Sequence, residues 1–127
     1  MFTCLSVNAD LIEANNKQLD RLLEDGVTII DVRRADEWAE TGVIEGSHPV
    51  TFFDRTGRYD ARKWLHQLAL LSDRNAPVIL ICRSGNRTKT IGRWLTKEIG
   101  YEKVYNVTEG IDSWIKSGRP TVSLPKG

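Results

Sequence analysis

The sequence predicts an α/β fold in which a mostly parallel central sheet is covered by helices on both faces. A β-branched run over residues 27–32 and a continuous apolar run over residues 78–81 are typical of strands that are buried on both sides. Segments with apolar residues at helical spacing lie before, between and after these runs. Because parallel strands need long crossover connections, this alternation favours three layers, with the sheet in the middle.

The N-terminal part of the chain is expected to begin with a short strand or turn near residues 10–14. Asn15 or Asn16 can cap the helix that follows, whose apolar face consists of leucines, and Gly26 ends it. The buried strand over residues 27–32 comes next.

Residues 35–40 are expected to form a short helix that ends near Gly42. The stretch 42–59 is rich in turn-forming residues, and we predict only one brief strand there, over residues 50–52. Asp60 can cap the next helix. The apolar stripe of that helix consists of Trp64, Leu65, Leu68 and Leu71.

Pro77 opens the central strand, which ends at Cys82. The helix after it carries apolar residues at i, i+3, i+4 and i+8, and Gly100 ends it. These apolar residues are Ile91, Trp94, Leu95 and Ile99. Residues 103–107 are predicted to form the last strand. A final helix follows, with an apolar face of Ile111, Trp114 and Ile115; Gly118 ends it and Pro120 prevents its continuation.

Length and charge narrow the classes of function. With 127 residues, the chain is expected to form one domain over residues 1–127. Its 18 basic and 17 acidic side chains give a net charge of +1, so we expect no nucleic-acid or membrane partner. The segment 1–4 lacks the pattern of a signal peptide, and no apolar run approaches the roughly 20 residues of a membrane helix. We therefore expect a cytoplasmic protein.

The segment from Cys82 to Thr88 carries the most specific chemical signal in the chain. It places a thiol where a buried strand stops and a helix begins. Backbone N–H groups of the loop and the positive end of the helix dipole would favour the thiolate, which is the nucleophilic form of cysteine. Arg83 and Arg87 add donors and positive charge suited to an anionic substrate. Cys82 is therefore predicted to be a catalytic nucleophile.

The remaining residues of this loop have simpler expected roles. Gly85 suits a positive φ or a close approach to the ligand. Ser84 and Thr88 can hydrogen-bond the sulfur or cap the following helix, and we expect at least one of them to act as a cap. The residues predicted to bind the substrate are Arg83, Ser84, Gly85, Asn86, Arg87 and Thr88.

Other polar residues are expected to have structural roles. Asp31 and Arg33 end a strand, and we interpret them as an ion pair or turn contact. His48 and His66 belong to no cluster with zinc-ligand spacing, so neither a metal ion nor a cofactor is expected. Cys4 has no electropositive context and is interpreted as a bystander, with a resolving role as the alternative.

Three segments give the chain a resemblance to the rhodanese-like family of single-domain sulfurtransferases. The first combines Asp31-Val32-Arg33 with Glu37-Trp38 and residues 42–47, and the second is the loop 82–88. The third combines residues 104–106 with Gly110-Ile111, Trp114, Gly118 and Pro120. The chain departs from the family pattern at Val43, where members often have histidine, and at Glu109, where paired glycines are common.

This resemblance implies a three-layer rhodanese-like fold and a reaction. The thiolate of Cys82 would take the outer sulfur of thiosulfate or a related small anionic donor and hold it as a persulfide. A thiol or cyanide would then accept the sulfur. Related phosphatases and arsenate reductases have an arginine six positions after the cysteine, whereas Arg87 lies five positions after Cys82. Two further alternatives remain: a sulfur carrier that works with a relay protein, and a non-catalytic interaction domain.

Overall fold

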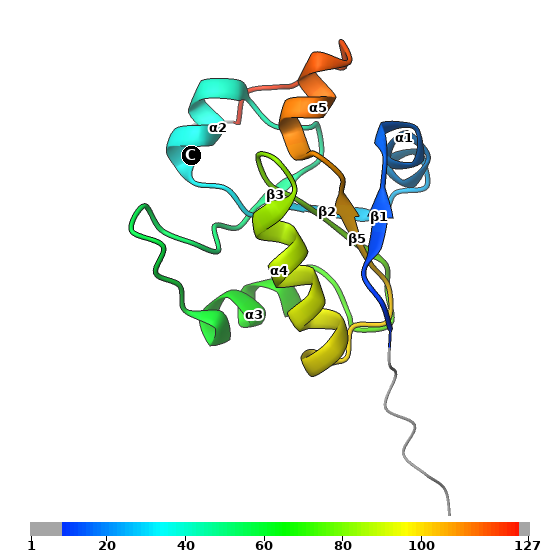
Figure 1. The fold of residues 1–127 in the computed structure, drawn as a ribbon, viewed down its shortest axis with the longest axis vertical. Coiled ribbons are helices and arrows are strands. Elements are labelled where there is room, and N and C mark those ends of the chain that lie inside the picture. The colour runs from blue at the N-terminus through cyan, green and yellow to red at the C-terminus, as the bar shows by residue number, and fades with distance from the viewer. Residues whose placement is uncertain (1–8, 125–127) are drawn as a thin grey trace, which may run out of the picture.

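The computed structural model describes residues 9–124 of the chain. Strands and helices alternate along these residues (Figure 1). In chain order they are β1 (Ile12–Ala14), α1 (Asn16–Glu24), β2 (Thr28–Asp31), α2 (Ala35–Thr41), β3 (His48–Pro49), α3 (Ala61–Ala69), β4 (Val78–Ile81), α4 (Asn86–Trp94), the π-helical turn η1 (Leu95–Ile99), β5 (Val104–Val107) and α5 (Gly110–Lys116).

All five strands belong to one sheet with the order β1-β5-β4-β2-β3, and every neighbouring pair is parallel. The fully buried β4 lies at the centre, where Val78 aligns with Thr28 of β2 and with Val104 of β5. Because β4 touches no water on either side, its sequence is continuously apolar rather than alternating. The predicted α/β class and parallel sheet are confirmed.

Two hydrophobic cores lie on opposite faces of the sheet. One is formed with α3 and α4, and it includes Ile30, Val32, Trp64, Leu68, Leu80, Cys82, Ile91 and Leu95. The other is formed with α1 and α5, and it includes Leu19, Ile29, Ile79, Ile81, Val107, Ile111 and Trp114. Alternate residues of β2 and β4 thus point to different cores, as the pleat of a strand requires. The predicted three-layer arrangement is confirmed.

Side-chain caps begin two of the helices where the sequence predicts them. Asn15 accepts a hydrogen bond from the Gln18 N–H at 2.9 Å, and the Gln18 side chain accepts one from the Asn15 N–H at 2.8 Å. This reciprocal pair satisfies two donors that the first turn of α1 leaves unpaired. Asp60 likewise accepts from the Lys63 N–H at the start of α3.

The strand predicted over residues 50–52 is wrong, because β3 lies at His48–Pro49. The following segment still runs beside the end of β2: the N–H groups of Val50 and Phe52 donate to the carbonyls of Asp31 and Val32. The chain after Val32 turns into α2, so regular pairing stops there. Pro49 fits this edge position because an edge strand leaves N–H groups unpaired in any case.

Two predicted core residues differ from expectation, whereas the helix after the loop ends at Gly100, as predicted. Leu71 follows the end of α3 and is exposed, and Ile115 lies on the outer side of α5 with 40% of its surface exposed. The helix after the loop is not α-helical throughout, because its last turn is η1. There the N–H groups of Gly100 and Tyr101 both donate to the Leu95 carbonyl, which widens the turn.

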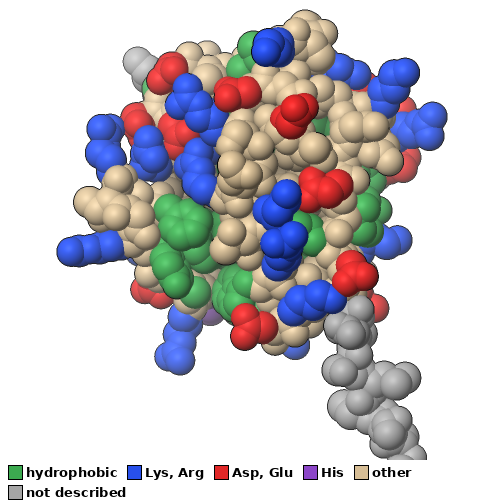
Figure 2. Space-filling model, in the orientation of Figure 1, with side chains coloured by type: hydrophobic (Ala, Val, Ile, Leu, Met, Phe, Trp, Pro, Cys, Tyr) green, Lys and Arg blue, Asp and Glu red, His purple; other side chains and the backbone are tan. Residues whose placement is uncertain are grey.

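Aromatic side chains from the segment 52–59 and from α4 form a patch that reaches the surface (Figure 2). Phe52 lies at its centre, and its ring is stacked on Tyr59 at 5.2 Å and makes an edge contact with Trp64 at 5.0 Å. Tyr59 remains 61% exposed.

Within the described residues, the helices are too short or too polar to cross a membrane.

Candidate active site

Cys82 is the first residue after β4, at the carboxyl end of the central strand. The chain turns there within a few residues, and α4 begins at Asn86 with Gly85 as its N-cap. Gly85 has φ 94°, a left-handed conformation that L side chains rarely adopt. In parallel α/β sheets ligands bind at the carboxyl ends of strands, which is where this loop lies (Figure 1).

Two polar groups contact the sulfur of Cys82. The N–H of Gly85 donates to Sγ at 3.1 Å, and the hydroxyl oxygen of Thr88 lies 3.3 Å from Sγ. The residue is otherwise fully buried within the core formed by α3 and α4. The sulfur is therefore held at the border between hydrocarbon and the polar start of α4.

Further N–H groups of the loop are available to an anion. Among the residues that the structure describes, no acceptor pairs with five backbone N–H groups around the start of α4. They belong to Arg83, Ser84, Asn86, Arg87 and Thr88. The first N–H groups of any helix lack partners inside the helix, and together with the helix dipole they attract negative charge.

The loop is fastened to the beginning of α5. The N–H groups of Ile111 and Asp112 donate to the carbonyls of Cys82 and Arg83 at 2.9 and 3.1 Å. At Gly110 the two backbones approach so closely that an added Cβ would lie 2.4 Å from the Arg83 oxygen. The carbonyls are thereby turned toward α5 and away from the unpaired N–H groups.

A chain of hydrogen bonds connects Cys82 to the edge of the sheet. Thr88 contacts both Cys82 and the side-chain oxygen of Asn106, which is buried on β5. The side-chain nitrogen of Asn106 donates to both carboxylate oxygens of Glu13 on β1 at 3.1 Å, and to the Gly85 carbonyl at 3.2 Å. Sequence analysis missed Asn106 and Glu13. The available signal was a polar residue inside the apolar run 104–107.

Arg87 is held by a carboxylate that the sequence analysis did not connect to the loop. Its guanidinium donates two hydrogen bonds to Glu37 of α2, at 2.8 and 2.9 Å. Burial acts to raise the pKa of Glu37, but hydrogen bonds and positive charge from Arg87 and Arg34 outweigh it and lower that pKa. The Glu37 hydrogen bond raises the pKa of Arg87. The Arg87 side chain thus joins α4 to α2.

Arg83 has no such fixed partner. Its side chain is 53% exposed and lies 3.9 Å from Glu40 and 3.8 Å from Asp112, beyond ordinary hydrogen-bond distances. The side chains of Ser84 and Asn86 are also on the exposed side of the loop. The expectation that Ser84 or Thr88 caps α4 is wrong, because Gly85 is the N-cap and no side chain accepts a capping hydrogen bond there. Thr88 instead contacts the sulfur, which was its alternative role.

Asp31 and Arg33 form the structural ion pair that the sequence suggests. They are 0% and 1% exposed, with a nitrogen–oxygen distance of 2.9 Å. Arg33 also donates to Thr41 and to the Gly42 carbonyl, and the Trp38 indole N–H donates to Asp31. Every polar atom of this pair is therefore used in fixing α2 and the turn after it.

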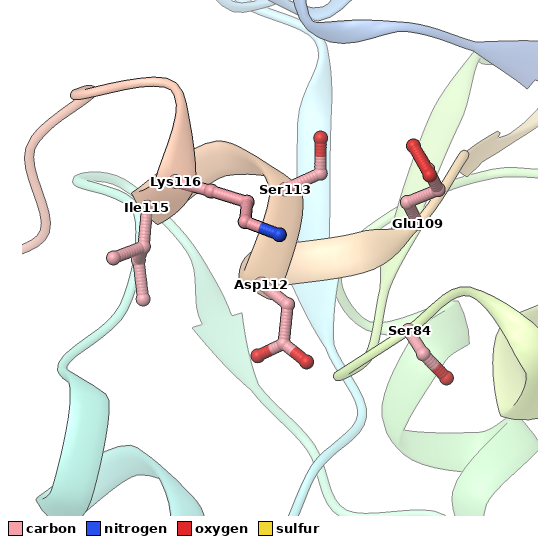
Figure 3. Close-up of a pocket in the computed structure, with 6 residues that line it drawn as sticks. All are labelled: Ser84, Glu109, Asp112, Ser113, Ile115 and Lys116. Carbon is pink, nitrogen blue, oxygen red and sulfur yellow. The ribbon is translucent and has the colours of Figure 1, made fainter.

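A hollow of ≈ 640 Å³ opens beside the loop. Its lining residues are Ser84, Glu109, Asp112, Ser113, Ile115 and Lys116. Figure 3 shows the α5 side chains on one side of this space, with Ser84 and Glu109 on the other. Ile115 is exposed because it faces this hollow rather than the core.

Among residues 9–124 no cluster of side chains could hold a metal ion, and Cys4 lies outside the described residues.

The site consists of a cysteine at the N-terminal end of a helix, on a three-layer fold with a parallel sheet. Comparison with known protein families shows which family has this arrangement. Residues 15–117 match the rhodanese-like domain. The chain belongs to the rhodanese-like family.

Individual proteins and solved structures are also similar to this chain. The chain is 31% identical over 109 residues to the thiosulfate sulfurtransferase GlpE of Actinobacillus pleuropneumoniae serotype 3, a match covering 85% of this chain and 90% of that protein. Among solved structures, the polysulfide-sulfur transferase homodimer of Wolinella succinogenes superposes with a TM-score of 0.69 and 27% identity, covering 93% of this chain and 82% of that one. Rv0390 of M. tuberculosis gives a TM-score of 0.72 and 26% identity, covering 88% and 96%.

Proposed function

We propose that this protein is a thiosulfate sulfurtransferase in which Cys82 carries the sulfur. The Cys82 thiolate attacks the outer sulfur of thiosulfate, the S–S bond of the donor breaks, and sulfite leaves with the bonding electron pair. The product is a persulfide on Cys82. Cyanide or a thiolate then attacks the terminal sulfur, and the electron pair of the persulfide bond returns to Cys82.

The observation that carries this proposal is the set of donors around one sulfur atom. Gly85 N–H already bonds Sγ, and five further loop N–H groups lack acceptors among the described residues. A persulfide adds one anionic sulfur, which such donors stabilise as they would an oxyanion. Because Cys82 is fully buried, the loop has to open slightly to admit the donor.

Arg83 is the side chain best suited to the anionic donor. It is exposed and lies near two carboxylates without a close bond to either, so a dianion can draw it away. Arg87 would contribute through its backbone N–H, since Glu37 occupies its guanidinium. This division also argues against a phosphatase, which would need the arginine side chain for the phosphoryl group.

A sulfur carrier that is loaded by a protein partner would use the same persulfide. The match to the GlpE sulfurtransferase of A. pleuropneumoniae supports thiosulfate as the donor. Transfer from a persulfidated partner that is much faster than turnover with thiosulfate and cyanide would support the carrier instead. A non-catalytic interaction domain would need no sulfur chemistry at Cys82.

Mass spectrometry after incubation with thiosulfate tests the proposal. We expect a gain of about 32 Da, one sulfur atom on the nucleophile, which cyanide removes as thiocyanate. The two cysteines allow a matched comparison: Cys4→Ser should keep the gain and Cys82→Ser should lose it. Absence of the gain in the wild-type protein, or its persistence in Cys82→Ser, would reject the proposal.

A further inference from the structure

The orientation of the Asn106 side chain is fixed by three oxygen atoms. Its amide nitrogen lies 3.1 Å from each carboxylate oxygen of Glu13 and 3.2 Å from the Gly85 carbonyl oxygen. None of these oxygens can donate a hydrogen bond. The reversed amide would place its oxygen against all three, so the Asn106 oxygen has to face Thr88.

Thr88 has one hydroxyl proton and three neighbouring atoms that could accept it: Asn106 Oδ1, Cys82 Sγ and the Gly85 carbonyl oxygen, which is the most distant of the three at 3.4 Å. Asn106 Oδ1 is only an acceptor, so in their hydrogen bond Thr88 is the donor. The proton is then unavailable to Cys82, whose Sγ lies 3.3 Å from the Thr88 oxygen. In this arrangement the Cys82 thiol donates to Thr88, and the bond favours the neutral form of the sulfur.

Ionisation of Cys82 reverses what Thr88 has to do. Once the thiol proton has passed to solvent, the Thr88 lone pairs face an anion unless the hydroxyl rotates and donates to Sγ. That rotation leaves the oxygen of Asn106 without a partner, and Asn106 is 1% exposed. A buried polar atom that loses its hydrogen bond is costly, so part of the gain at the sulfur is cancelled.

The geometry points to Asn106 as a positioning residue that acts through Thr88 to hold Cys82 in its thiol form until the loop is used. This inference rests on the proposed function only in taking Cys82 as the nucleophile. Glu13 fixes the Asn106 amide from the neighbouring strand, with which it is in register. The residue that restrains the nucleophile therefore lies outside the loop that activates it.

Asn106→Leu removes the competing acceptor and leaves the other members of the network paired. Gly85 O still accepts from the Lys89 N–H, and Glu13 still accepts from the Thr108 hydroxyl. The acceptors that remain for the Thr88 hydroxyl are Cys82 Sγ at 3.3 Å and the Gly85 carbonyl at 3.4 Å, and a thiolate is the charged one of the two. We expect the midpoint of Cys82 ionisation to move down by about one pH unit, the size of one hydrogen bond to a charged group.

Thiolate absorbance in the ultraviolet, recorded against pH, measures this midpoint without requiring access to the buried sulfur. The Cys82→Ser protein serves as the reference that subtracts Cys4. Tyr105→Phe on the same strand is the control: its side chain packs toward the opposite core, and we expect no shift. In a Thr88→Val background, Asn106→Leu should produce no shift either, because the proton in question is gone.

An unshifted midpoint in Asn106→Leu, or a shift that persists without the Thr88 hydroxyl, would overturn the inference. Asn106→Ala makes the same test if leucine prevents folding. Infrared spectroscopy of the wild-type protein provides a measurement that needs no variant at Asn106: the S–H band of Cys82 should be that of a hydrogen-bonded thiol and become that of a free thiol in Thr88→Val. A free-thiol band in the wild type would overturn the donor assignment. These readouts require no sulfur transfer, so they stand apart from the persulfide experiment.

Discussion

Gly110→Ala is expected to damage catalysis by displacing the loop that carries Cys82. An added Cβ at this position would lie 2.4 Å from the Arg83 oxygen and 2.5 Å from the Cys82 oxygen, whereas ordinary contacts begin at 3.4 Å. The loop backbone therefore has to retreat by about 1 Å. Gly118, just after the same helix, offers a matched control, because its φ is also positive and nothing lies within 4 Å of its added Cβ.

The two substitutions share one cost and differ in another. A left-handed conformation costs an alanine about 1–2 kcal/mol at either position. Overpacking adds about 1–3 kcal/mol at Gly110 alone. A displacement of about 1 Å in a catalytic group can reduce the rate on the order of 100-fold. We thus expect Gly118→Ala to lose some stability and keep its activity, and Gly110→Ala to lose more stability and most of its kcat/KM.

Urea unfolding and steady-state transfer of sulfur from thiosulfate to cyanide measure the two quantities separately. The activity assay has to be run well below the unfolding transition of the weaker variant, so that both proteins are folded. If the two variants lose activity equally, or if Gly110→Ala is as active as the wild type, the contact between α5 and the loop does not position the nucleophile.

Three further predictions concern charged side chains. Arg83→Gln should raise KM for thiosulfate by about tenfold, because it removes one charged hydrogen bond to the donor, and it should change stability little. Arg62→Gln on α3 is the control, with an unchanged KM expected in the same assay. Arg33→Met should lower the free energy of unfolding by about 3–5 kcal/mol in urea, because it leaves the Asp31 carboxylate buried without its partner; a cost below about 1 kcal/mol would contradict this. The lowered pKa of Glu37 means that its ion pair stabilises the fold above the ordinary value of 4.5, and that this contribution disappears as the pH falls through the folded-state pKa. In urea, Glu37→Gln should thus have a free energy of unfolding about 1–3 kcal/mol below that of the wild type at neutral pH, and this difference should disappear at acid pH. A difference that does not depend on pH would contradict the ion pair as its cause.

The fold was accessible from the sequence because burial leaves a simple pattern in a parallel sheet. A strand covered on both faces has to be apolar throughout, as Val78–Ile81 is, and the capping side chains of Asn15 and Asp60 mark where helices begin. Edge strands leave a weaker pattern, since only one neighbour restrains them. For that reason β3 was displaced by two residues in the prediction.

Only those parts of the candidate site whose residues are neighbours in the sequence could be predicted from it. The position of Cys82 at a strand end and the role of Gly85 follow from local chain geometry. The partner of Arg87 does not, because Glu37 lies 50 residues away and an exposed helix would contain the same carboxylate. Asn106 is similar: its sequence context indicates a strand, and only the register of the sheet brings it next to Thr88.

The three-residue edge strand β1 contributes a side chain to the proposed active site. It pairs with β5 alone, and Glu13 is the residue through which it meets the site. A chain truncated just before Asn15 would retain every helix, the loop and the other four strands. It would nevertheless lack the carboxylate that orients Asn106, so a minimal domain chosen by its helices would fold around a nucleophile whose proton is differently placed.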